Sequence, residues 1–315
     1  MDDVLVRPRP RGRFPALHVA LFLATVATTL WAGFELSPLA TRAPSVSNVI
    51  RGGLPFAASL VAILFSHEMG HYLVARRHGV LATLPYFIPV PFGAGTLGAV
   101  IRMRSSIPSR RAALDIAAAG PLAGFAVAMP LLLWGLAHSE VTAVAHAPAG
   151  ETLASPLALV RALWEGRPLL AGGGATQFFG DSLVTLAARF AVHGELAPGT
   201  DVLLHPVAFA AWLGLLVTAL NLVPVGQLDG GHVLYALVGR RGAHAGSRIM
   251  SAALLCAGLF LSWNWLVWWA LTRVLIGVRH PPALCEEPLD PARQAVAILS
   301  LVLFALTFVP IPVSF

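Results

Sequence analysis

The chain has 315 residues, of which 57% are hydrophobic and 11% are charged, and its mean hydropathy is +0.76. A water-soluble globular protein carries roughly 25% charged residues, so this composition argues against soluble domains and predicts a polytopic membrane protein. The net charge of +6 includes 21 basic residues, all of them arginines, which stand in short groups beside apolar runs. Such placement is typical of anchoring in a lipid bilayer, and we expect no nucleic-acid partner.

The first predicted membrane helix covers residues 16–34. Four arginines stand among prolines between positions 7 and 13, just before this apolar run of 19 residues. The apolar core of a cleaved signal peptide is shorter, and no clear small-residue cleavage site follows, so we expect a retained helix with a cytoplasmic N-terminus. Residues 35–53 contain two prolines and several hydroxyl side chains, and they predict a short external loop.

A second apolar run, residues 54–75, is 22 residues long, which is enough to span the hydrocarbon core of a bilayer. Inside it lies the H-E-x-x-H motif His67-Glu68-Met69-Gly70-His71. Residues four apart lie on nearly the same face of a helix, so both imidazoles can bind one zinc ion. Glu68 lies one step off that face, where its carboxylate can act as general base on a water molecule at the metal. Arg76 and Arg77 follow and predict a cytoplasmic end for this helix.

A H-E-x-x-H pattern also arises by chance in ordinary helices, so its surroundings decide how it is interpreted. An ionisable side chain at membrane depth costs about 2.5–3.5 kcal/mol or more. His67, Glu68 and His71 therefore need a compensating partner, and a metal cation is a partner that two histidines can hold. We predict a zinc site here.

Residues 80–101 are apolar but contain three prolines and three glycines, so they cannot form one spanning helix. We expect a re-entrant hairpin or a short pair of strands that lines the active-site cleft, because irregular backbone at membrane depth is tolerated only against protein or a water-filled cavity. An interfacial loop without a role is the alternative. Further arginines precede a third span over residues 112–137, where Gly120 and Pro121 begin a run of small residues that permits close helix contact.

The mixed composition of residues 138–206 predicts an external region that lies partly on the membrane surface. A fourth span begins near Pro206 and runs to residues 221–232, where proline and glycines break the helix and leave polar groups free to line a cavity. Residues 249–278 can form one long helix or a short hairpin. Residues 294–309 predict a last span.

These segments together predict an all-α polytopic membrane protein with about six to eight transmembrane helices, a re-entrant hairpin and a broken helix that forms the active site. The predicted division is an N-terminal anchor helix and external loop (1–53), a core that carries the zinc site (54–239) and C-terminal transmembrane helices (240–315).

A catalytic zinc ion needs three protein ligands and one open position for water, so one ligand is still missing. The extended motif H-E-x-x-H-x-x-G-x-x-H fails, because Val74 and Arg77 stand at its glycine and last histidine positions. Among the acidic residues away from loops and tails, Asp115 is expected in the first turn of the third span, where helix-end electrostatics explain a carboxylate. Asp229 is expected in the broken segment, at the depth of the two histidines, and we predict it as the third ligand.

These motifs resemble those of the site-2 protease family (peptidase family M50) of intramembrane zinc metalloproteases, in which an N-x-x-P-x-x-x-L-D-G segment follows the H-E-x-x-H helix. The second motif stands at residues 221–230, and Gly120-Pro121 lies between the two. The resemblance covers residues 54–239 and is greatest to the plant chloroplast subgroup, through residues 115–121 and 220–231. The PDZ-type insert and the C-terminal CBS pair of many relatives are not recognisable here.

The resemblance implies Zn²⁺ as cofactor, with His67, His71 and Asp229 as ligands and Glu68 as catalytic base. It implies regulated intramembrane proteolysis, the hydrolysis of peptide bonds within or near a transmembrane helix of a membrane-protein substrate. It also implies Asn221 as a polar contact in the cleft, where its amide can hold the substrate backbone or a developing oxyanion. The alternative for Asn221 is a helix-breaking residue satisfied by nearby backbone.

Two other classes of function remain open. A polytopic metal transporter would also place histidines and an aspartate in apolar helices, but it would not need Glu68 as a base. A non-catalytic scaffold that binds membrane helices would normally have lost one of the site residues. The lysine-free basic content and the absence of a transit peptide favour the inner membrane of a bacterium over a plastid as the location.

Overall fold

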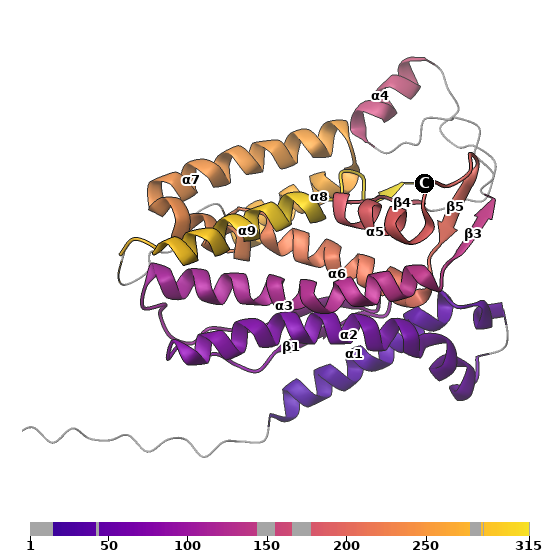
Figure 1. The fold of residues 1–315 in the computed structure, drawn as a ribbon, viewed down its shortest axis with the longest axis horizontal. Coiled ribbons are helices and arrows are strands. Elements are labelled where there is room, and N and C mark those ends of the chain that lie inside the picture. Colours follow the sequence, from indigo (N-terminus) through magenta and orange to yellow (C-terminus); the bar gives the residue numbers. More distant parts are fainter. Residues whose placement is uncertain are drawn as a thin grey trace, which may run out of the picture.

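The computed structural model describes residues 15–41, 44–143, 155–165, 178–277, 285 and 287–314, and it shows a bundle of helices that run along one common direction (Figure 1). Four of the helices are long and apolar enough to cross a membrane: α1 (Ala16–Glu35), α2 (Val46–Arg77), α3 (Arg110–Ala137) and α7 (Asp229–Phe260). Shorter apolar helices are α5 (Leu183–His193), α6 (Pro206–Leu222) and α9 (Pro291–Thr307). The predicted all-α polytopic membrane protein is confirmed.

Shorter elements join these helices: the 3₁₀ helix η1 (Pro38–Thr41), α4 (Pro156–Trp164), α8 (Trp263–Leu271) and the π-helical turn η2 (Thr272–Ile276). The strands are β1 (Tyr86–Pro89), β2 (Thr96–Val100), β3 (Glu140–Ala143), β4 (Phe178–Phe179), β5 (Thr200–Leu203) and β6 (Val313–Ser314). Each strand pairs antiparallel with one other, β1 with β2, β3 with β5, and β4 with β6.

The two ends of the bundle differ in character. We call one the arginine-rich end, because α2 finishes there at Arg76 and Arg77 and α3 begins there at Arg110 and Arg111. The other, here the loop end, carries α5 and the β3–β5 and β4–β6 ribbons, and the C-terminus lies there (Figure 1). The predicted exposure of residues 138–206 outside the membrane remains a prediction, and residues 144–154 and 166–177 lie outside the described part.

Helix α2 starts earlier than predicted. Its first residue is Val46, and the side chain of Ser45 caps it by accepting a hydrogen bond from the backbone N–H of Asn48. Small residues then hold this first part of α2 against α1, since a Cβ on Gly53 would collide with the carbonyl oxygen of Leu30. The expectation of a loop through residue 53 was therefore wrong in extent, because close helix packing stabilises helix where the composition alone suggests a loop.

Residues 80–101 form the predicted pair of strands. Tyr86 pairs with Val100 and Phe87 with Ala99, and the connection between the strands includes Gly93 and Gly95, both at positive φ. The hairpin lies against α1, where the buried ring of Phe87 meets that of Phe22 edge-on at 5.1 Å between centroids. Packing from one side by α1 thus accounts for a stable two-stranded unit in an otherwise helical protein.

The break after α6 is shorter than predicted. Residues 223–228 are non-helical, whereas Asn221 still belongs to α6, and Asp229–His232 already belong to α7. Helix α7 continues through the arginines near 240 and changes direction at Gly239, whose φ of 73° only glycine adopts readily. It turns back at Ser262, which caps α8, so residues 249–278 follow the hairpin alternative and not the single long helix.

Candidate metal centre and active site

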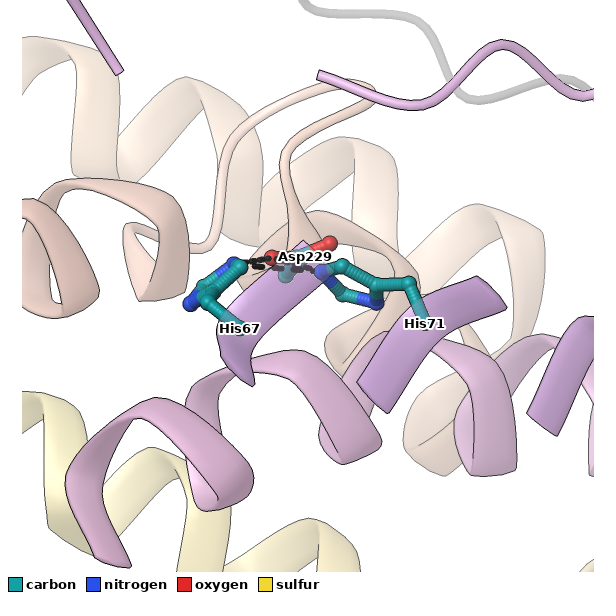
Figure 2. A group of neighbouring side chains, drawn as sticks. All are labelled: His67, His71 and Asp229. Carbon is teal, nitrogen blue, oxygen red and sulfur yellow. Dashed lines mark hydrogen bonds and ion pairs between the residues drawn. The ribbon is translucent and has the colours of Figure 1, made fainter. Parts of the chain in front are cut away.

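Three potential metal ligands from two helices converge (Figure 2). His67 and His71 lie four residues apart on α2, and their Nε2 atoms are 3.1 Å apart. Asp229 is the first residue of α7, and its Oδ2 lies 3.4 Å from Nε2 of His67 and 3.1 Å from Nε2 of His71. The structure therefore brings together the three residues that the sequence nominated as ligands.

The spacing of these atoms suits a tetrahedral zinc ion. Donor atoms at about 2.0–2.1 Å from such an ion lie roughly 3.3 Å from one another, which matches the observed separations. The other ring nitrogen of His71, Nδ1, donates to the carbonyl oxygen of Ile116 at 2.7 Å. This bond selects the tautomer of neutral His71 whose Nε2 carries a lone pair, as metal-binding histidines require. The donor set and its orientation thus fit zinc.

Glycines on α3 let the histidine rings approach that helix. A Cβ on Gly120 would occupy the space of the His71 ring, and one on Gly124 would lie 3.3 Å from Nδ1 of His67. Gly70 on α2 faces the backbone of Ala119 in the same way. Pro121 cannot donate to the carbonyl of Ala117, which loosens α3 beside this contact. The small residues seen in the sequence therefore serve the site directly.

The turn between α6 and α7 places Asp229. Gly226 has a φ of 55°, and the backbone N–H of Leu228 donates to the carbonyl of Val225 within the turn. Gly230 and Gly231 pack on backbone carbonyls of this turn and of the end of α6, where any Cβ would collide. The carboxylate stands at the N-terminus of α7, where the helix dipole favours a negative charge.

Glu68 is buried beside this group and faces a cavity of about 760 Å³. Both the His–His–Asp group and Asn221 line the cavity. Further walls come from residues 99–103 and 105–107, which continue from strand β2. The hairpin region predicted as a cleft wall thus contributes its last residues to this cavity.

Asn221 lies in the last turn of α6, with Nδ2 3.3 Å from Nε2 of His67. Asn221 is still helical, and its amide contacts a site histidine. This contact favours the predicted position in the cleft over the alternative of a helix-breaking residue satisfied by nearby backbone. The amide therefore reaches the His–His–Asp group from a third helix.

Asp115 does not belong to the His–His–Asp group, and its carboxylate has other partners than expected. Helix α3 begins at Arg110, so Asp115 lies in the second turn and not in the first. Its carboxylate accepts hydrogen bonds from Arg293 of α9 and contacts His78, the residue that follows α2. Helix-end electrostatics do not account for it; the ion pair with Arg293 and the hydrogen bond with His78 do.

Sequence reasoning missed two features of the site. The carbonyl of Ile116 is a backbone acceptor, which a search for functional side chains does not reveal. Arg293 is 178 residues from Asp115 along the chain. The sequence offers Arg111, four residues before Asp115, as the obvious partner, but Arg111 contacts Glu287 and the carbonyl of Pro288, so no local signal identifies Arg293.

The model of peptidase family M50 matches residues 55–264. The chain belongs to peptidase family M50. It is 31% identical over 269 residues to Probable zinc metalloprotease EGY2, chloroplastic, of Arabidopsis thaliana, covering 85% of this chain and 43% of that protein.

A second relative is Probable zinc metalloprotease EGY1, chloroplastic, of Oryza sativa subsp. japonica, which is 33% identical over 268 residues, with 83% of this chain and 41% of that protein covered. The chain thus spans less than half the length of these curated relatives. No solved structure matches it significantly.

Proposed function

We propose that this chain is an intramembrane zinc metalloprotease. The observation that carries the proposal is the convergence of His67, His71 and Asp229 at zinc-binding distances, with Glu68 beside them in a cavity between helices. Membership of family M50 and the zinc metalloprotease relatives support the same chemistry.

In this proposal His67, His71 and Asp229 hold the metal. Zinc, when bound, would supply Lewis-acid activation of water and of the scissile carbonyl. Glu68 takes a proton from the attacking water and passes it to the leaving amine, a role that its position one residue from His67 allows. Asn221 donates from its amide to the substrate carbonyl or backbone, because Nδ2 already points to the same centre as the ligands.

The proposed substrate is a transmembrane segment of another membrane protein. Such a helix must unwind locally before a peptide bond can enter the cavity, and the irregular residues 101–107 offer backbone groups beside the site. Water would enter from the arginine-rich end, which the positive-inside rule assigns to the cytoplasm, with the N-terminus on that side. The proposed location is the inner membrane of a bacterium, and the proposed catalytic core remains residues 54–239.

A catalytic trap tests this proposal and identifies substrates. Cells that express Glu68→Gln should accumulate membrane proteins that cells with the wild-type chain cleave, because the variant keeps the metal ligands and loses the base. Quantitative proteomics of membranes from the two strains measures this. If no membrane protein differs while zinc transport across vesicles is retained in the variant, the transporter alternative replaces the protease.

A further inference from the structure

A cluster of polar side chains at the arginine-rich end joins α3, α9 and the residue that follows α2. Arg293 of α9 donates from Nε to Oδ1 of Asp115 at 2.9 Å and from Nη2 to Oδ2 at 2.8 Å. Nε2 of His78 lies 3.0 Å from the same Oδ2, and Nη1 of Arg293 also reaches Asp290 at 2.7 Å. A planar guanidinium that binds a carboxylate through two parallel bonds fixes distance and orientation at once.

Two members of this cluster lie close along the chain to groups of the metal centre: Asp115 to Ile116, and His78 to His71. Asp115 precedes Ile116, whose carbonyl accepts from Nδ1 of His71. His78 follows His71 by seven residues, which is about two turns and brings both to the same face of α2. The carboxylate therefore ties α3 to α2 at the point where α3 orients a proposed ligand.

Helix α9 supports α7 as well. Leu114 and Ala117 of α3, Val233 and Ala236 of α7, and Ala297 of α9 form one buried cluster. Arg110 of α3 donates to the carbonyl of Ala236 at 2.7 Å, near the kink that ends the first part of α7. Asp229 starts that same part of α7, so the helix with the third proposed ligand is held by the elements that the charge cluster joins.

We propose that Asp115 and Arg293 are positioning residues that set the orientation of His71. Helix α9 would then influence the metal centre through Arg293, although it supplies no ligand. This inference rests on the proposed zinc function. Loss of the pair would release α3 from α9, and loss of the Asp115 carboxylate would also weaken the contact with His78 at the end of α2. The hydrogen bond that His71 donates to the carbonyl of Ile116 would then lengthen or break. Direct hydrogen-bond partners of metal ligands typically change metal affinity or activity by about 10–100-fold, and residues that act through such a partner should fall at or below the low end of that range.

The test compares Arg293→Gln, Asp115→Asn and the conservative Arg293→Lys in the purified full chain. We expect a changed absorption spectrum of the Co²⁺-loaded protein, release of zinc to a chromogenic chelator about tenfold faster, and a lower kcat with little change in KM. Lysine keeps the charge but not the fork, so Arg293→Lys should recover part of each loss.

A matched control is available at the loop end. Arg189 also bridges two carboxylates, at 2.9 Å to Asp181 and 3.1 Å to Asp201, and its side chain is exposed to a similar degree as that of Arg293. Arg189→Gln removes a comparable ion pair far from the site and should leave the Co²⁺ spectrum and zinc release unchanged.

The double variant Asp115→Asn/Arg293→Gln should be close to the more affected single variant, because each single variant already loses the bonds between Asp115 and Arg293. A wild-type Co²⁺ spectrum and wild-type zinc release in folded Arg293→Gln would overturn the inference, and so would additive losses in the double variant. Unfolding of all three single variants would also overturn it, by showing that the pair stabilises the whole fold. Because the spectrum does not depend on cleavage, a protein that binds Co²⁺ but cuts nothing would refute the proposed function and leave this inference testable.

Discussion

The two ends of the helix bundle differ in what their interiors bury: polar side chains at one end and apolar side chains at the other. Toward the arginine-rich end, buried polar side chains such as His67, Glu68 and His71 are compensated by one another and by the backbone of α3. Toward the loop end the interior is an apolar cluster that includes Ile63, Leu132 and Leu215. The difference teaches that exact side-chain geometry is concentrated in one half, while the other half depends on close packing of interchangeable apolar groups.

The largest contrast should come from removing a carboxylate at each end. Asp229→Ala removes one of three proposed ligands, so bound zinc should fall well below one per chain and proteolysis to background. Asp181→Ala at the loop end breaks a partly exposed ion pair with Arg189, and this variant should keep both its bound zinc and its proteolytic activity. Elemental analysis of purified protein gives the zinc content. Zinc retained in Asp229→Ala would remove this residue from the centre.

Asn221→Ala should slow cleavage strongly without releasing the metal. A hydrogen-bond donor to a developing oxyanion contributes on the order of 10²–10³ in rate, whereas the ligands would remain in place. Initial rates at saturating substrate and zinc content should therefore separate in this variant. Cleavage at the wild-type rate with zinc bound would make Asn221 a purely structural partner of His67.

Two glycines of α3 sharpen the comparison between the ends. Gly120→Ala drives a methyl group into the ring of His71, and Gly135→Ala drives one into the backbone of Ala208 on α6. We expect Gly120→Ala to weaken zinc binding. We expect Gly135→Ala to lower the free energy of unfolding by about 1–3 kcal/mol and to leave zinc binding normal in the folded protein. Chelator competition and thermal unfolding measure the two effects. The same response in both variants would mean that the ends are not distinct.

The smallest perturbation tests the orientation of the two ends. Single cysteines replacing exposed Arg77 and Glu195, in a chain without Cys256 and Cys285, should react with a membrane-impermeant maleimide from opposite sides. The positive-inside rule predicts labelling of position 77 only after the cytoplasmic face is opened. Labelling of position 77 in intact cells would reverse the proposed orientation of the active site.

Much of this site could be predicted because its chemistry is local in sequence. The spacing of His67 and His71 follows from helix geometry, and the need for an anionic ligand at their depth left Asp229 as the candidate. The contacts that orient these groups could not be predicted in the same way. Asn221 meets His67 across 154 residues and Arg293 meets Asp115 across 178, and no periodic pattern encodes such pairs.

The fold shows the same division. Long apolar runs predicted the positions of α1, α3 and α9, because the length and composition of a run decide whether it can span a bilayer. The start of α2 at Val46 and the bend of α7 at Gly239 depend on a cap and on a single backbone angle. Such features can be recognised only once the neighbouring helices are known. Composition alone therefore predicted a loop where the first part of α2 forms.

The central claim is that water, activated in the His67, His71 and Asp229 centre with Glu68 as base, cleaves a peptide bond of a membrane segment. Purified full chain reconstituted in liposomes with a substrate found by the Glu68→Gln trap, in water enriched in ¹⁸O, tests it by mass spectrometry of the products. The account predicts one ¹⁸O in the new C-terminal carboxyl group, at a bond within or beside the transmembrane segment, and no product with Glu68→Gln or after zinc removal by a chelator. Equal cleavage by Glu68→Gln, or cleavage that survives complete zinc removal, would contradict it.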